Sequence, residues 1–120
     1  MVKVLLVDDE ELVRRVVRVV LEAEGHDVLE AGDGGAALSA LRDGRPDVVV
    51  LDLIMPGEDG VDVCRRIKRS NGGARVLVLT SLPPDEAKSQ CADAGADDFM
   101  VKPFSPLELI RRVSALADTA

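Results

Sequence analysis

DVVVLD, residues 47–52, is an apolar run that ends on a carboxylate. A short run of β-branched residues and leucine is typical of a strand in a parallel sheet that is buried on both faces. Three other apolar runs also end on a polar or charged residue. Residues 2–7 lead into Asp8 and Asp9, residues 75–79 into Thr80, and residues 98–101 into Lys102. Because parallel strands end at the same edge of a sheet, we expect three carboxylates, a hydroxyl and an ammonium group to meet there.

Between these runs, apolar residues recur every three or four positions, which predicts amphipathic helices. The expected helices are marked by residues 10–23, closed by Gly25; 36–41, closed by Gly44; 61–67, ending before Asn71; 84–94, closed by Gly95; and 105–116, opened by the capping box Ser105-Pro106-Leu107-Glu108. In the first helix, we expect a core-facing side of Leu12, Val13, Val16, Val19, Val20 and Ala23, and a solvated side of Arg14, Arg15, Arg18 and Glu22.

The half-polar run at residues 26–31 predicts one more strand, the second along the chain. Five strands alternating with five helices give a doubly wound α/β fold, because parallel neighbours need right-handed crossovers that cover both faces of the sheet. The second strand is the most polar, so we place it at an edge, in the order 2-1-3-4-5. Ligands of such sheets bind where the strand order reverses, which puts Asp8, Asp9 and Asp52 around one crevice. We expect residues 1–120 to form a single domain.

The composition describes a chain with an aliphatic core and an acidic surface. Hydrophobic residues make up 47% of the 120 residues but aromatic residues only 2%, and the formal net charge is −7. A surface of this sign repels nucleic acid, so we expect no direct nucleic-acid binding by this domain. The sequence shows neither an apolar stretch of roughly 20 residues nor a signal-peptide pattern, so we expect a cytoplasmic protein without membrane contact. Cys64 and Cys91 are expected to be small, unbridged helix or core residues.

Carboxylates that are crowded at one edge either raise one another's pKa or require a cation. Mg²⁺ fits such a site, because it is a hard ion that accepts a few carboxylates, keeps several waters and bridges to phosphate oxygens. Lys102 adds a fixed positive charge and Thr80 a hydroxyl donor. This set would receive a dianion attached to a carboxylate, and an aspartyl phosphate with Asp52 as the nucleophile meets that description.

Four blocks of the sequence carry a family resemblance: VLLVDDE at residues 4–10, VVVLDLIMPGEDG at 48–60, VLVLTS at 76–81 and GADDFMVKPFSP at 95–106. In this order and spacing, they resemble the receiver domain of two-component response regulators over essentially the whole chain. The resemblance implies a flavodoxin-like (βα)5 fold.

The resemblance also implies a reaction and a metal site. A sensor histidine kinase or a phosphotransfer protein would phosphorylate Asp52. Mg²⁺ would be held by Asp52, by Asp9 directly, by Asp8 through water and by the backbone carbonyl of Ile54. The domain would catalyse only its own Mg²⁺-dependent phosphorylation and dephosphorylation, and so would not be an enzyme for other substrates.

A conformational switch is the next implication of the resemblance. Thr80 and Lys102 would each contact a phosphoryl oxygen, and the Lys102-Pro103 peptide bond would be cis. As Thr80 moves toward the phosphoryl group, the ring of Phe99 would turn inward. This would change the face formed by the fourth helix, the fifth strand and the fifth helix, and thereby control an output domain or partner.

The same face carries a possible dimer interface. Lys88, Asp98, Glu108 and Arg112 are placed as in receivers that dimerise through it. This implies a phosphorylation-dependent homodimer.

Two other classes of protein also fit parts of the pattern. A Mg²⁺-dependent phosphatase or phosphotransferase of the haloacid-dehalogenase type also uses an aspartate at a strand end. That class expects a second aspartate two residues later, where Ile54 stands. A flavin-binding module of flavodoxin type expects a phosphate loop rich in Gly, Ser and Thr after the first strand, and this chain has acidic residues there.

Overall fold

The computed structural model describes residues 2–70 and 73–118. The third helix ends at Arg69, before Asn71 as expected. Within those ranges the strands of the main sheet are β1 (Lys3–Val7), β2 (Asp27–Ala31), β3 (Val48–Leu51), β6 (Arg75–Thr80) and β7 (Asp98–Val101). The helices are α1 (Glu11–Ala23), α2 (Gly34–Gly44), α3 (Gly60–Arg69), α4 (Pro84–Ala94) and α5 (Pro106–Asp118). All pairings in the five-stranded sheet are parallel, and the strand order is β2-β1-β3-β6-β7. This confirms the predicted fold and the predicted order.

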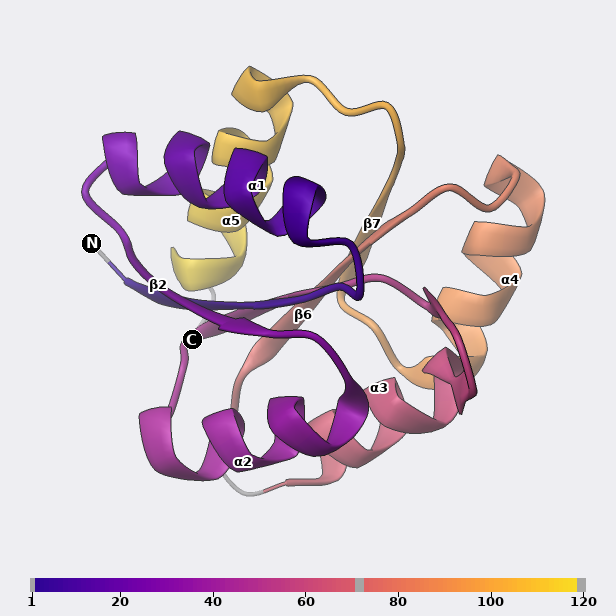
Figure 1. Ribbon diagram of the computed structural model, residues 1–120. Coiled ribbons are helices and arrows are strands. Elements are labelled where there is room, and N and C mark those ends of the chain that lie inside the picture. The colour runs from indigo at the N-terminus through magenta and orange to yellow at the C-terminus, as the bar shows by residue number, and fades with distance from the viewer. Residues whose placement is uncertain (1, 71–72, 119–120) are drawn as a thin grey trace.

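Helices cover both faces of the sheet (Figure 1). α1 and α5 lie on one face, and α2, α3 and α4 lie on the other. Residues 48–51 of β3, in the middle of the sheet, are at most 4% exposed, because their side chains alternate between the two helical layers. Two aliphatic clusters form the core, one on each side of the sheet. No helix in the described part of the chain is both long and apolar enough to span a membrane.

A short antiparallel pair, which the sequence did not predict, follows β3. It consists of β4 (Ile54–Met55) and β5 (Glu58–Asp59), with Gly57 in the turn at a φ of 73°. The Asp59 side chain accepts hydrogen bonds from the backbone N–H groups of Val61 and Asp62 and so caps α3. Two-residue strands carry no periodicity, which is why the sequence pattern did not show them.

The expected inner face of α1 is partly wrong. Val17 and Leu21 are the buried residues of this helix, whereas Leu12, Val16 and Val19 are 69%, 45% and 63% exposed. Apolar residues occupy two adjacent stripes of α1, so their spacing predicts the helix but does not decide which stripe meets the sheet.

Two helix ends also differ from expectation. Gly44 is the last residue of α2, and the left-handed position that ends the helix is Arg45, with a φ of 47°. At the start of α5, the Ser105 hydroxyl accepts a hydrogen bond from the Glu108 N–H at 3.4 Å. The Glu108 carboxylate pairs with Arg112 instead of returning to Ser105, so only half of the expected capping box is observed.

Candidate functional site

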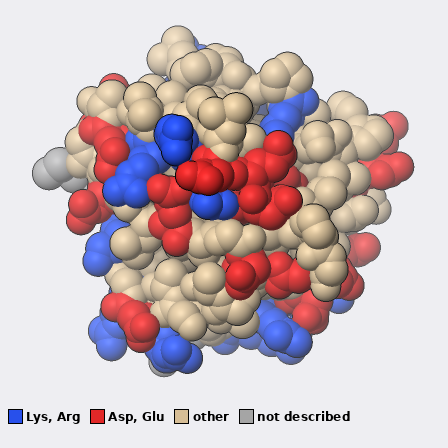
Figure 2. All heavy atoms as spheres, viewed as in Figure 1, with Lys and Arg blue, Asp and Glu red and all other residues tan. Residues whose placement is uncertain are grey.

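The sheet register brings the polar residues at the strand ends to one edge. Val7 of β1 pairs with Leu51 of β3, so Asp8 and Asp52 are the next residues on two neighbouring strands. Asp8, Asp52 and Thr80 are the buried polar or charged residues of the described chain, at 6%, 4% and 0% exposure. Acidic side chains gather over the end of β1 and the start of α1 on the face shown in Figure 2.

Lys102 lies between the two buried carboxylates. Its Nζ atom is 2.9 Å from Asp8 Oδ2 and 3.0 Å from Asp52 Oδ2, and its side chain is only 15% exposed. Burial, the largest influence, lowers the pKa of Lys102, but the hydrogen bonds and charges of the two carboxylates outweigh it and leave the pKa above its ordinary value. The ammonium group is therefore a permanent counter-charge at neutral pH.

Backbone N–H groups fix the other oxygen of each carboxylate. Asp52 Oδ1 accepts a hydrogen bond from the Ile54 N–H at 2.9 Å, and Asp8 Oδ1 accepts one from the Glu10 N–H at 2.9 Å. Each carboxylate is thus held on one side by its own loop and on the other by Lys102. The pair is oriented before any ligand arrives.

The carboxylates at this edge suit a hard divalent cation. Oxygen atoms of Asp8, Glu10 and Asp52 lie within 4.8 Å of one another, which is close enough to share one ion. Thiolate ligation is disfavoured, because burial raises the pKa of both Cys64 and Cys91 to about 11 and both lie in the core. The oxygen-rich donor set therefore fits Mg²⁺.

The membership of this cluster differs from the ligand set that the sequence suggested. Asp9 is exposed, and within the described residues its carboxylate lies outside the group that Asp8, Glu10 and Asp52 form. Glu10 takes its place, although the sequence reasoning assigned it only to a helix start. The carbonyl of Ile54 and the direct role of Asp9 remain predictions.

Thr80 and Phe99 are connected to the site through β6 and β7. The Thr80 hydroxyl accepts a hydrogen bond from the Leu82 N–H at 3.3 Å, and the Thr80 carbonyl accepts one from the Lys102 N–H at 2.7 Å. Phe99 is partly buried and packs against the core cluster beneath α2, α3 and α4. The Lys102-Pro103 peptide bond is cis, which confirms that expectation.

The four residues of the possible dimer face lie on α4, β7 and α5. Arg112 pairs within its own chain, with Asp98 at 2.9 Å and with Glu108 at 2.9 Å, and it also donates to the Phe99 carbonyl at 2.8 Å. Lys88 is exposed on α4. In this structure, three of the four charged groups are thus partners of one another.

Comparison with known proteins identifies the family of this chain. The model of the response regulator receiver domain family matches residues 4–114. The chain belongs to this family. It is therefore a receiver domain of the kind found in two-component systems.

Individual relatives agree with this assignment. The DNA-binding response regulator MtrA of Mycolicibacterium smegmatis is 42% identical over 113 residues, which cover 94% of this chain and 49% of that protein. The transcriptional regulatory protein ResD of Bacillus subtilis is 42% identical over 114 residues, which cover 95% of this chain and 47% of that protein. This receiver domain thus spans about half the length of the curated relatives that it matches.

A solved structure of a similar protein carries a ligand. The response regulator TrrA of Thermotoga maritima, in complex with Mg²⁺ and BeF, has a TM-score of 0.85 and 32% identity, covering 97% of this chain and 99% of that one. A response regulator receiver domain from Francisella, with a TM-score of 0.89 and 34% identity, covers 99% of this chain and 98% of that one.

Proposed function

We propose that this receiver domain accepts a phosphoryl group on Asp52 from a phosphohistidine of a sensor kinase or phosphotransfer protein, in the presence of Mg²⁺. One observation carries the proposal: a half-buried lysine, Lys102, bridges two buried carboxylates, Asp8 and Asp52, at the switch point of the sheet. Burial of two like charges is costly for a purely structural feature. The same arrangement suits a group that must gain negative charge during a reaction.

The transfer is a displacement at phosphorus. An Asp52 carboxylate oxygen forms the new P–O bond, the P–N bond to the donor imidazole breaks, and its electron pair stays on the imidazole nitrogen. Asp52 thereby changes from a carboxylate to a phosphorylated group with about two negative charges. Lys102 offsets part of this charge, and the Thr80 hydroxyl donates a hydrogen bond to a phosphoryl oxygen. A bound Mg²⁺ supplies the remaining positive charge.

The structural response follows from the position of Thr80. Its hydroxyl oxygen accepts from the Leu82 N–H, and its O–H can donate to a phosphoryl oxygen on Asp52, so phosphorylation would draw the side chain toward Asp52. Phe99 then turns into the space that Thr80 leaves and changes the face of α4, β7 and α5. This face would act on an output domain or on another partner. We expect the domain to act in the cytoplasm and without direct contact to nucleic acid.

A small-molecule phosphodonor tests the central step. After incubation with acetyl phosphate and Mg²⁺, the intact-protein mass of the wild-type domain should rise by one phosphoryl group, and Asp52→Asn should abolish the increase. Asp93→Asn, on the exposed surface of α4, is the matched control and should leave it unchanged. A phosphorylated Asp52→Asn variant would overturn the assignment, as would a wild-type protein that takes up no phosphoryl group.

The direct metal ligand beside Asp52 is tested separately. Asp9→Asn should weaken Mg²⁺ binding by about 10-fold or more if Asp9 turns inward to ligate the ion, and Glu10→Gln should weaken it comparably if the ion uses the cluster as it stands. Calorimetric titration with Mg²⁺ separates the two cases. Equal affinity of both variants and wild type would contradict both ligand assignments.

Dimerisation is a further part of the proposal. Asp98, Glu108 and Arg112 would have to exchange their internal partners for those of a second chain. Sedimentation across a range of concentrations, with and without beryllofluoride and Mg²⁺, should show a larger mass only for the activated domain. An unchanged mass would argue against the dimer.

The alternative of a phosphatase or phosphotransferase acting on other substrates has less support. Ile54 occupies the position where that class carries its second aspartate, and Ile54 is 46% exposed. We therefore propose that the domain acts only on its own Asp52. Turnover of an external phosphate ester by the purified domain would contradict this.

A further inference from the structure

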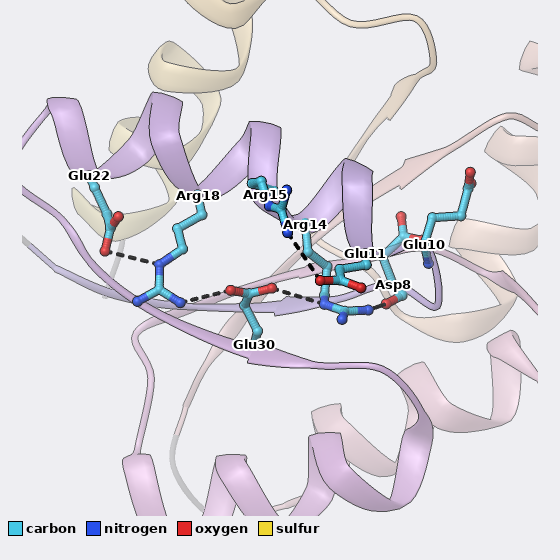
Figure 3. A network of polar contacts seen from close by, with 8 residues as sticks. All are labelled: Asp8, Glu10, Glu11, Arg14, Arg15, Arg18, Glu22 and Glu30. Carbon is cyan, nitrogen blue, oxygen red and sulfur yellow. Dashed lines mark hydrogen bonds and ion pairs between the residues drawn. The ribbon is translucent and has the colours of Figure 1, made fainter.

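Arg14, which the sequence placed on the solvated side of α1, instead reaches back to the acidic edge. Its side chain is only 17% exposed. Nη1 donates a hydrogen bond to the backbone carbonyl of Asp8 at 2.6 Å, and Nε donates one to Glu30 on β2 at 3.0 Å (Figure 3). One guanidinium group thus connects α1, β2 and the end of β1.

Glu30 holds this guanidinium in place. While one of its oxygens accepts from Arg14, the other accepts from Arg18 at 2.7 Å, and Arg18 also pairs with Glu22 (Figure 3). The hydrogen bond from Arg18, as the largest cause, keeps the pKa of the Glu30 carboxyl below its ordinary value despite partial burial. Glu30 is therefore ionised at neutral pH and orients Arg14 toward Asp8.

The Asp8 carbonyl is the point where β1 ends and the acidic turn into α1 begins. The Asp8 N–H still bonds to Ala31 of β2 at 3.2 Å, and the Asp8 carboxylate accepts from the Glu10 N–H. The carbonyl is fixed by a side chain, that of Arg14. This contact and the bond from the Glu10 N–H to the Asp8 carboxylate both hold the chain where it turns toward Asp9 and Glu10.

We propose that Arg14 is a positioning residue for the cation site: it holds the turn of residues 8–10 so that the carboxylates of Asp8 and Glu10 lie close to that of Asp52. The proposal rests on the proposed binding of Mg²⁺ at this edge. Arg14 acts through the backbone and touches neither the ion nor the phosphoryl group.

Two effects of Arg14 on cation binding have opposite signs, which makes the role testable. Its positive charge repels Mg²⁺, so removal of the charge alone would strengthen binding. Loss of the contact to Asp8 would loosen the turn and weaken binding. The direction of the change in affinity therefore distinguishes a positioning role from a purely electrostatic one.

Arg18 provides a matched control. Arg18 is one turn further along α1 and pairs with the same carboxylate, that of Glu30. Its hydrogen bonds go to the carboxylates of Glu22 and Glu30, whereas Arg14 also donates to the Asp8 carbonyl. Arg14→Met and Arg18→Met both remove one charge and one bond to Glu30. Only Arg14→Met removes the contact to Asp8.

The experiment is a calorimetric titration with Mg²⁺ of the wild-type domain, Arg14→Met, Arg14→Gln, Arg14→Lys and Arg18→Met at one ionic strength. We expect the dissociation constant for Mg²⁺ to rise about 10-fold in all three Arg14 variants, because outer-shell contacts typically change metal affinity by 10–100-fold. Arg14→Lys keeps the charge but lacks the fork that reaches both partners, so it should behave like the neutral variants. Arg18→Met should stay within about twofold of wild type, as expected for an exposed charge.

Amide hydrogen exchange without metal gives a second readout. The Glu10 N–H should exchange faster in Arg14→Met than in Arg18→Met, because its acceptor on Asp8 is less well fixed. Far-UV circular dichroism verifies that each variant is folded, and Arg14→Lys or Arg14→Gln carries the test should Arg14→Met not fold.

Unchanged or tighter Mg²⁺ binding by the folded Arg14 variants would overturn the positioning role while leaving the proposed function intact. An equal loss of affinity in Arg18→Met would also overturn it, since the effect would then belong to charge or to Glu30. A wild-type domain that binds no Mg²⁺ would overturn the proposed function itself, and this inference with it.

Discussion

Replacement of Lys102 by methionine measures how much the ammonium group stabilises the two carboxylates of Asp8 and Asp52, which we call the charge balance of the site. Methionine keeps the apolar stem and removes the ammonium group from between Asp8 and Asp52, whose side chains are 8% and 4% exposed. Breaking a buried ion pair by removal of one partner costs about 3–5 kcal/mol. We expect Lys102→Met to lower the free energy of unfolding by this amount at neutral pH without divalent cations.

Mg²⁺ should reverse part of this loss. An ion that binds only the folded state stabilises it by about 2.7 kcal/mol at a concentration 100 times its dissociation constant. In Lys102→Met, the ion no longer competes with the ammonium group for the two carboxylates, so it should bind more tightly than in wild type. The difference in stability between the two proteins should therefore narrow as Mg²⁺ is added.

The assay is urea unfolding followed by far-UV circular dichroism, because the chain contains no Trp or Tyr for fluorescence. With a slope of about 2 kcal/mol per molar urea, the expected loss moves the midpoint down by about 2 M. Lys88→Met, at an exposed position on α4, is the control and should change stability by less than about 0.5 kcal/mol. The charge-balance argument fails if both variants lose equally little, or if Mg²⁺ leaves the difference unchanged.

Three further predictions concern stability. The folded-state pKa of Lys102 is raised above its ordinary value of 10.5. The stabilisation by Lys102 is therefore complete below about pH 10.5 and is lost as the pH rises through the raised pKa. The urea midpoints of wild type and Lys102→Met should converge above that pH. Gly60→Ala should destabilise by about 1–3 kcal/mol, because an added Cβ would overlap the backbone carbonyl of Leu53, and a gain in thermal stability would contradict this. Leu21→Ala, at a site with 0% exposure, should lower the free energy of unfolding in urea by about 2–5 kcal/mol. Leu12→Ala, at 69% exposure, should lower it by less than about 0.5 kcal/mol. Equal losses would contradict the observed packing of α1, in which Leu21 and not Leu12 faces the sheet.

The meeting of Asp8, Asp52 and Lys102 could be predicted from the sequence because it depends only on topology. Each lies directly after an apolar run whose short length and β-branched residues favour a buried strand over a helix. Parallel strands with right-handed crossovers then leave one edge for all their ends. No side-chain detail is needed for this step, which is why it was reliable.

The contacts of Arg14 and Glu10 could not be predicted in the same way. Helical periodicity gives the direction in which Arg14 leaves α1 but not the length of its reach or the presence of Glu30 on a neighbouring strand. Glu10 and Asp9 are adjacent in sequence, and the turn between β1 and α1 decides which of them faces Asp52. Both outcomes are set by tertiary geometry around a loop, where local patterns carry little information.

From the same geometry we expect the stability of this domain to be coupled to its proposed phosphorylation. Asp8 and Asp52 are buried within reach of one ammonium group, an arrangement that hydrophobic residues of similar volume would replace without loss of stability. Under the proposed function, a divalent cation would reduce the repulsion between the two carboxylates, and a phosphoryl group would add negative charge that Lys102 must then share. A change in the occupancy of this edge should therefore change the free energy of the ends of β6 and β7, because the Lys102 N–H, directly after β7, donates to the carbonyl of Thr80, the last residue of β6. A site with neutral residues in place of these acids would be easier to fold, but it would have no carboxylate to accept a phosphoryl group and no negative charge to attract Mg²⁺.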